Sequence, residues 1–580
     1  MVNQLQHLPE PTSPRQDARV TLADGRVFSA PIGTPLRDYI QAAYPEPGAD
    51  GWVVAAIINN ELHELTQTVH HDVTVAPLTL GESEGERVYR QSLVLLLITA
   101  VAELFPGIKI NVNHSIPIGG FYCSVVGREP FTTDELKRIM ARMRAIAQED
   151  AAIVRTEMPM DKAIAYFEAR REDDKLRLLR SRKRDCLTVY QLHDTVEYLF
   201  GHLTASTGAL KYFDLIAASR SDGFILLFPR TGDHGRLPDY RESRKLEDVF
   251  LRTRKWLDVM QIEDIGRLNQ AIAEKRIREE VLIAEALQTR YIAEIAAMIA
   301  ERHAAGVRLV LIAGPSSAGK TTFSKRLAVQ LMAYGIRPFT LEMDNYYVDR
   351  DLTPRDDTGA YDFEALNALN LERLNGDVLK FMQRVQVQMP RYDFKLGKSL
   401  PGDTVRLTDD HIIVAEGIHG LNPGLMAGVP QERIVRIYVS ALTTLNIDRH
   451  NRVPTTDVRL LRRMVRDSTQ RGHSAQETLD RWESVQRGEK RNIFPYQENA
   501  DVMFNSSLFY ELAVLRPYAE PLLRQIEHTS PRYIEAKRLL ALLSWIRPAK
   551  AKYVPSDSLL REFIGGSILE TYTPGTMKLP

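Results

Sequence analysis

The stretch Gly314-Pro315-Ser316-Ser317-Ala318-Gly319-Lys320-Thr321-Thr322 decides the fold of the C-terminal half. It follows Val307–Ala313, an apolar run typical of a buried strand, and precedes Phe323–Tyr334, which has the pattern of a helix. Strand, glycine-containing loop and helix in this order form the Walker A motif in its required context. The alternative is a glycine turn with a surface lysine. The motif predicts an α/β domain with a mostly parallel sheet and a phosphate-binding loop.

The side chains of this loop predict the cofactors ATP and Mg²⁺. Lys320 is expected to reach the β- and γ-phosphates, and the Thr321 hydroxyl to ligate Mg²⁺. The chain contains no Asn-Lys-x-Asp string, which would indicate guanine recognition. The residues expected to surround the nucleotide phosphates are Gly314, Ser316, Ser317, Ala318, Gly319, Lys320, Thr321 and Thr322.

Two acidic residues stand where predicted strands end. Asp344 follows the strand Phe339–Met343, and Glu416 follows the strand His411–Ala415. Ligands of open α/β sheets collect at the carboxyl ends of the strands. Asp344 is therefore a candidate general base for an acceptor hydroxyl, and Glu416 a second candidate Mg²⁺ ligand. A turn or capping role is the alternative for each.

Four arginines recur at helical spacing further along the chain. The predicted helix Val458–Asp467 places Arg459, Arg462, Arg463 and Arg466 on one face, and Arg471 follows it. Such a face can grip phosphates and neutralise charge during transfer. We interpret it as a lid over the nucleotide. The alternative is a solvated face paired with Asp457 and Asp467.

Six strings in the block from Val307 to about Leu523 match a known family: 314–322, 344–347, 361–364, 390–394, 416–420 and 462–467. Through them the block resembles the uridine kinase and phosphoribulokinase family. It also resembles longer bacterial proteins in which synthetase-like domains precede a uridine-kinase-like domain. The resemblance implies an ATP- and Mg²⁺-dependent kinase that phosphorylates the 5′-hydroxyl of a nucleoside-like small molecule.

The resemblance also implies roles for single residues. Asp344 matches the general base, and Glu364 falls where an Asp of the family binds the ribose hydroxyls, with Arg463 assisting. Tyr392 matches an aromatic residue beside the base. The implied catalytic residues are Lys320, Asp344, Arg463 and Arg466, and Arg471 is implied to contact the nucleotide.

Three positions that read the pyrimidine in this family differ in this chain. The expected histidine is Gly397, the expected arginine is His473, and the expected glutamine is Arg481. Changed hydrogen-bonding groups change which base is accepted. The implied substrate-binding residues are therefore Glu364, Tyr392, Arg463, His473 and Arg481, with the base left open; a purine nucleoside, a sugar or a phosphorylated acceptor are alternatives.

The N-terminal half resembles domains of threonyl-tRNA synthetases. Short strands over 19–77, with a hairpin turn at 23–26, resemble the β-grasp-like TGS domain.

The block 86–229 has an α+β pattern and resembles the second additional, editing domain through the strings 104–106, 118–122 and 204–213. The four positions of the editing histidines and cysteine are Gln91, Leu95, Leu199 and Leu203, with His193 and His202 out of register. None of the four can ligate a metal, so we expect a scaffold or binding domain without editing chemistry.

Composition excludes several classes of protein. Of 580 residues, 75 are Lys or Arg and 75 are Asp or Glu, so no overall basic field favours nucleic acid or an anionic membrane. Two cysteines are too few for a disulfide framework. The longest apolar run, Leu93–Val101, is about half of a membrane span. We expect a soluble, cytoplasmic protein without membrane contact.

The sequence predicts a multidomain α/β and α+β protein. Its predicted divisions are a disordered tail at 1–16, a TGS-like domain at 17–78, an editing-like domain at 85–235, a helical linker at 240–305, the P-loop domain at 306–530 and a helical extension with a tail at 531–580. Relatives of this kind tend to oligomerise, so a homo-oligomer is one expectation.

Three functional hypotheses remain from the sequence. The leading one is a nucleoside kinase. The second is a P-loop ATPase or pyrophosphatase that uses water as acceptor. The third is a regulatory module in which the N-terminal domains sense tRNA or a nucleotide alarmone, with ATP occupancy as a switch.

Overall fold

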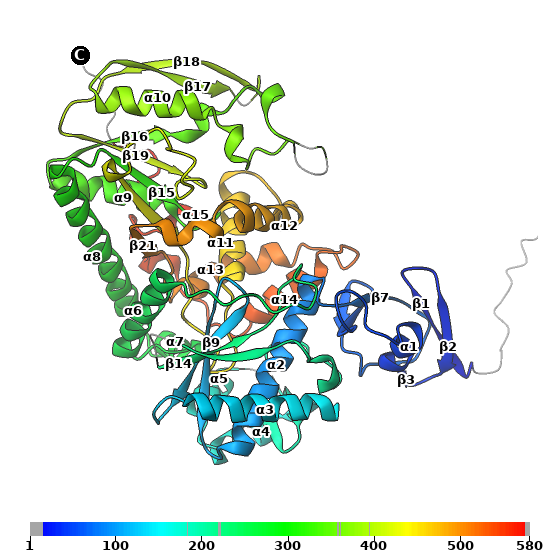
Figure 1. Cartoon of the computed structure of the whole chain (residues 1–580). Coiled ribbons are helices and arrows are strands. Elements are labelled where there is room, and N and C mark those ends of the chain that lie inside the picture. The colour runs from blue at the N-terminus through cyan, green and yellow to red at the C-terminus, as the bar shows by residue number, and fades with distance from the viewer. Residues whose placement is uncertain are drawn as a thin grey trace, which may run out of the picture.

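The computed structural model describes residues 15–182, 184–218, 222–355, 359, 361–393, 395–572 and 574. A β-grasp-like unit, an α+β unit and an α/β unit with a parallel sheet follow one another along the chain (Figure 1), as the sequence predicts. The predicted tail 1–16 lies almost wholly outside the described residues. Among the described residues, no helix combines the length and apolar character needed to cross a bilayer.

The N-terminal unit is a five-stranded sheet with one helix. Its strand order is β2-β1-β7-β4-β5, and β1 and β7 are parallel while the other pairs are antiparallel. Helix α1 buries Leu36, Tyr39, Ile40 and Ala43, whose spacing places them on one face. The bounds are β1 (Asp17–Leu22), β2 (Val27–Pro31), β3 (Thr34–Pro35), α1 (Leu36–Ala43), β4 (Ala55–Ile58), β5 (Glu61–His63), β6 (Thr68–Val69) and β7 (Val73–Leu78).

The α+β unit is built around helix α2 (Ser83–Leu104). Residues 92–101 are all buried, because the antiparallel sheet β13-β14-β9-β8 and helix α3 (Thr133–Glu149) share a core with α2. A capping box between Thr132 and Glu135 begins α3. The other bounds are β8 (Lys109–Ser115), β9 (Gly120–Val126), β10 (Val154–Pro159), α4 (Met160–Ala169), α5 (Asp173–Arg180), β11 (Cys186–Leu192), β12 (Thr195–Glu197), β13 (Asp214–Ala217) and β14 (Gly223–Leu227).

Three helices form the predicted helical linker to the parallel sheet: α6 (Arg244–Met260), α7 (Ile265–Ala273) and α8 (Ile277–Ala304). Asp264 caps α7 by accepting a hydrogen bond from the Arg267 N–H at 2.7 Å, which explains why α7 begins separately from α6. Helix α8 lies along the side of the parallel sheet (Figure 1) and packs on α9.

The C-terminal unit contains a five-stranded parallel sheet in the order β16-β19-β15-β20-β21. Apolar residues of α8 and α9 cover one face, and α10 and the loop after β19 cover the other. Burial on both faces explains the unbroken apolar runs in the strands. The bounds are β15 (Leu309–Ala313), α9 (Lys320–Ala333), β16 (Arg337–Glu342), α10 (Leu371–Met382), β17 (Val387–Asp393), β18 (Lys398–Val405), β19 (His411–Gly417), β20 (Ile434–Ser440) and β21 (Val502–Asn505).

Helix α11 (Thr455–Gln470) does not form the arginine-faced lid that the sequence predicts. Arg459 and Arg462 are buried, at 1% and 0% exposure, and form ion pairs with Glu489 and Glu511. The partners lie on α12 (Ala475–Asn492) and α13 (Glu511–Leu523), so the arginines join three helices of the core. Helical spacing placed these residues on one face correctly but could not show that the face is covered.

The segment after residue 530 is part of the core. Helix α14 (Tyr533–Leu543) packs on α13, and Leu559, Leu560 and Phe563 are fully buried. Phe563, in the short helix α15 (Arg561–Ile564), lies 4.9 Å from the Arg462 guanidinium. Helix α15 packs on α11.

Removing one partner of the buried pair should destabilise this core. In the variant Glu511→Ala, Arg462 would remain buried without its carboxylate, and such losses cost about 3–5 kcal/mol. We expect a lower urea midpoint for the intrinsic fluorescence transition. Glu527→Ala, at an exposed position, is the control. An unchanged midpoint in Glu511→Ala would contradict the role given to this pair.

Candidate functional site

The carboxyl edge of the parallel sheet brings the predicted phosphate loop and both predicted acids together. The loop follows β15, Asp344 lies in the turn after β16, and Glu416 is near the end of β19, which pairs with both strands. The loop needs its glycines. A Cβ at position 314 would lie 1.9 Å from the Val439 carbonyl oxygen, and Gly319 has φ +83°.

The two predicted metal ligands are in contact. The Thr321 hydroxyl donates a hydrogen bond of 2.9 Å to Glu416 Oε1, and Glu416 Oε2 is buried without a hydrogen-bond partner. Burial raises the pKa of Glu416, and Lys320 opposes that shift. An orphaned buried carboxylate oxygen beside a hydroxyl fits Mg²⁺, which takes oxygen ligands and often only one or two from the protein.

Lys320 lies at the centre of a group of carboxylates. Its Nζ donates to the Pro315 carbonyl oxygen at 3.1 Å, so the side chain folds back over its own loop. Burial lowers the pKa of Lys320, and the carboxylates of Glu416, Glu562 and Glu489 oppose this. A cation held in this position is ready to contact a phosphate.

Two of these carboxylates also bind N–H groups of the loop. Glu489 Oε1 accepts a hydrogen bond from the Ser316 N–H at 2.8 Å, and Glu562 Oε2 accepts one from the Thr322 N–H at 3.1 Å. Thr322 is in the first turn of α9, where free N–H groups and the helix dipole favour an anion. Sequence reasoning missed both glutamates, because neither stands near a motif.

Asp344 is an exposed residue at this edge, with its carboxylate partly removed from water. Among the described residues, no hydrogen bond or ion pair is found for it. Its pKa is raised, chiefly by partial removal from water and then by the charge of Glu342, while Lys320 lowers it. A carboxylate with raised pKa and no competing donor can accept a proton from a hydroxyl group.

Glu364, Tyr392 and Arg463, three of the residues implied to bind the acceptor, lie in the same region. Glu364 rests on helix α12, where a Cβ at Gly488 would lie 1.4 Å from its Oε2 atom. Burial raises the pKa of Glu364, Glu489 adds to the shift and Arg463 opposes it. Tyr392 is buried with its ring 5.5 Å from that of Tyr347, which in turn lies near Asp344.

The remaining arginines surround one buried carboxylate. Arg463 Nε lies 3.2 Å from Asp467, Arg466 donates to Asp467 at 3.2 Å, and Arg471 lies 3.7 Å from it. Arg463 also donates to the Ser316 hydroxyl at 2.8 Å and thereby contacts the phosphate loop. These arginines therefore lie beside the loop, with Asp467 as a shared partner.

His473 and Arg481 lie together at the start of α12. The Arg481 Nη1 and His473 Nε2 atoms are 3.5 Å apart, and His473 Nδ1 is 3.9 Å from Glu477. No hydrogen bond or ion pair joins either side chain to the described residues of the phosphate loop. Their role toward a base stays a prediction.

The editing-like positions hold no catalytic group. Leu95, Leu199 and Leu203 are buried, and Gln91 donates a hydrogen bond of 3.2 Å to Asn451. Over the described part of the chain, no cluster of three or more His, Cys, Asp or Glu side chains is arranged to hold a metal ion.

Known proteins match the N-terminal and the C-terminal region of the chain separately. Residues 309–509, about a third of the chain, match the model of the phosphoribulokinase/uridine kinase family. A similarity to threonine–tRNA ligases covers the N-terminal region. The ligase of Nitratidesulfovibrio vulgaris is 32% identical over 197 residues, which are 34% of this chain and 30% of the ligase. That of Acetivibrio thermocellus is 28% identical over 202 residues, 35% of this chain and 31% of the ligase. The chain thus spans about a third of the length of these relatives.

Solved structures similar to the chain include kinases. A possible uridine kinase of Bacillus stearothermophilus is 21% identical with a TM-score of 0.24, and covers 34% of this chain and 89% of its own. D-glycerate 3-kinase of Cryptococcus neoformans is 15% identical with a TM-score of 0.19, and covers 44% of this chain and 87% of its own. The match to the family model and the similarity to the ligases show that the chain combines a C-terminal domain of the phosphoribulokinase/uridine kinase family with an N-terminal region homologous to threonine–tRNA ligases.

Proposed function

We propose that the protein is an ATP- and Mg²⁺-dependent kinase that phosphorylates the 5′-hydroxyl of a nucleoside. One observation carries the proposal. Asp344, a carboxylate with a raised pKa and no partner among the described residues, lies at the same sheet edge as Lys320 and the Thr321–Glu416 pair. A base for the acceptor and the groups for the phosphates are thus on adjacent strands.

Different residues of the chain have different roles in phosphoryl transfer. The loop N–H groups and Lys320 hold the phosphates, and Asp344 takes the proton of the attacking hydroxyl. Thr321 and Glu416 would hold Mg²⁺, which would neutralise charge on the phosphates. Arg463, Arg466 and Arg471 add positive charge beside the loop, where negative charge increases during transfer. The catalytic contribution is positioning and electrostatics.

The acceptor would lie between Glu364 and Tyr392. Glu364 offers two oxygens to the ribose hydroxyls, and Tyr392 an aromatic ring beside the base. Changes at Gly397, His473 and Arg481 leave the identity of the base open. We propose the nucleoside class on the basis of Glu364 and Asp344, which serve the ribose irrespective of the base.

A second candidate function is regulatory. Glu489 and Glu562 hold two N–H groups of the phosphate loop, so ATP has to displace or move them. Such a contact suits a P-loop that changes between two states, with the synthetase-like domains sensing RNA or a nucleotide. Acceptor-dependent ADP release distinguishes the two functions, because a switch or an ATPase needs no nucleoside.

The first prediction from the proposed function concerns Asp344. In a panel of nucleosides with MgATP, we expect one of them to stimulate ADP release and to yield a 5′-monophosphate. Asp344→Asn should lower kcat by about 10²–10⁴-fold, the usual contribution of a general base, while ATP binding is kept. Because the base acts deprotonated and its pKa is raised, kcat/KM should fall on acidification at a pH above that of an ordinary aspartate. No stimulation by any nucleoside would refute the kinase proposal.

The second prediction concerns the acceptor subsite. Gly488→Ala would place a methyl group on Glu364 Oε2 and so displace this carboxylate. We expect the KM for the nucleoside to rise about tenfold, as for one lost charged hydrogen bond, with an unchanged KM for ATP. Gly376→Ala, in α10, where a Cβ meets no atom within 4 Å, is the matched control. Equal changes in both KM values would show that Glu364 is not part of the acceptor site.

The third prediction concerns the contact between α15 and the loop. Glu562→Gln removes a negative charge beside the Thr322 N–H, so we expect the Kd for MgATP, measured by calorimetry, to fall about fivefold. Glu527→Gln, at an exposed position, should leave the Kd unchanged. Weaker ATP binding in Glu562→Gln would mean that the carboxylate supports the site instead of competing with ATP.

A further inference from the structure

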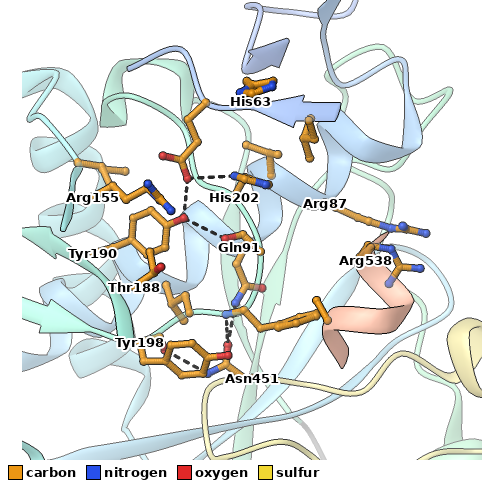
Figure 2. A pocket seen from close by; sticks show the side chains of 18 of the residues that line it. His63, Arg87, Gln91, Arg155, Thr188, Tyr190, Tyr198, His202, Asn451 and Arg538 are labelled. Carbon is orange, nitrogen blue, oxygen red and sulfur yellow. Dashed lines mark hydrogen bonds and ion pairs between the residues drawn. The ribbon is translucent and has the colours of Figure 1, made fainter. Parts of the chain in front are cut away.

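A large cavity lies away from the phosphate loop, between the N-terminal units and the C-terminal unit. Its volume is about 900 Å³, within the range of small-molecule sites. Figure 2 shows its wall, which combines residues of β5, α2, β11, the segment 198–205, the loop 450–454 and α14. Because parts that are distant in sequence meet here, the cavity exists only in the assembled chain.

Cations outnumber acids in the wall of the cavity. Nine lysines and arginines line it, against three glutamates. Six of the nine are paired with a carboxylate. Lys537 is bound by Glu61 at 2.8 Å, and Arg87 by Glu84 at 2.8 Å.

Three arginines of the wall have no such partner. Arg182, Arg184 and Arg452 form no ion pair or side-chain hydrogen bond with another described residue. The Nε atom of Arg452 is buried, its guanidinium lies 4.7 Å from the Phe121 ring, and burial together with Arg90 lowers the pKa of Arg452 to about 9. Arg452 as a whole is half-buried, and a guanidinium that is partly removed from water without an acid beside it favours a bound anion. Arg452 is therefore the position in the cavity that best suits an anionic group.

The same wall contains aromatic residues and neutral polar groups. Phe200 is half-buried, whereas Tyr190, Tyr198 and Trp545 are buried in the wall, with the Arg182 guanidinium 3.5 Å from the Trp545 ring. Figure 2 shows Tyr190, Gln91 and Asn451 facing the same space. Aromatic rings stack on bases, and amide and hydroxyl groups bind base edges or ribose. A ligand that satisfies both features is an aromatic ring that carries a phosphate.

We propose that this cavity is a second nucleotide site, which binds a free nucleoside phosphate with its phosphate at Arg452 and its base among the aromatic side chains. A single nucleotide fits better than RNA, because the cations lie inside the cavity and the neutral chain provides no basic field to attract a polynucleotide. The site is separate from the phosphate loop and does not require that the protein be a kinase.

Calorimetry on the full chain tests this site. In the Lys320→Ala background, which weakens binding at the phosphate loop, the probes are AMP, GMP, UMP, CMP, inorganic phosphate and a short ribo-oligonucleotide. We expect at least one mononucleotide to bind, and Arg452→Met to weaken it about tenfold or more, as for a lost charged contact. Arg278→Met, at an exposed position of α8, is the control and should have no effect. Because Arg452 has no acid partner, Arg452→Met should not lower the thermal unfolding midpoint.

A second measurement locates the ligand. Cys186 is exposed and lines the cavity, whereas the only other cysteine, Cys123, is buried. The bound mononucleotide should therefore slow alkylation of Cys186 by iodoacetamide, and Arg452→Met should remove this protection. The proposal is overturned if no mononucleotide binds, if inorganic phosphate binds as tightly as every mononucleotide, if only the oligonucleotide binds, or if Arg452→Met leaves binding and protection unchanged.

Discussion

The buried guanidinium of Arg462 is the charge around which the C-terminal unit is organised. Its exposure is zero, and it is compensated by Glu511, by the Ser506 carbonyl oxygen at 2.9 Å and by the Ser317 carbonyl oxygen at 3.4 Å. A charge that is removed from water needs several such partners. These come from α13, from the end of β21 and from the phosphate loop, so one side chain fixes the relative positions of all three.

Arg459 repeats this arrangement one turn earlier. It pairs with Glu489 and donates to the Ser316 carbonyl oxygen at 2.9 Å. Two arginines thus hold the backbone of the loop from outside. The N–H groups of Ser316 and Thr322 point to the place where a phosphate would bind, and carboxylates of the chain accept their hydrogen bonds there. Preorganised donors of this kind lose little entropy when the phosphate binds, which is what a phosphoryl-transfer site requires.

Features that depend on a short stretch of sequence could be predicted from the sequence. The strand–loop–helix order located the phosphate loop, and parallel strand ends located Asp344 and Glu416 at one edge, because both follow from chain direction alone. The role of Arg459 and Arg462 could not be predicted, since helical spacing shows which residues share a face but not what packs against it. Glu489, Glu562 and the cavity were missed for the same reason. Each arises where segments more than a hundred residues apart meet, and the sequence carries no signal for such a meeting.

The contact between Glu562 and the Thr322 N–H has a consequence for how the chain is made. The two residues are separated by 240 positions, and Leu559, Leu560 and Phe563 fill core space beside α11. Domains generally fold as units during synthesis, N-terminal parts first. The β-grasp-like and α+β units can bury most of their apolar residues early. The phosphate loop emerges from the ribosome long before α15, so its helix N-terminus is open to any anion in the cell until the last core residues arrive. A nucleotide that binds at that stage would not have to displace the Glu562 carboxylate from the Thr322 N–H.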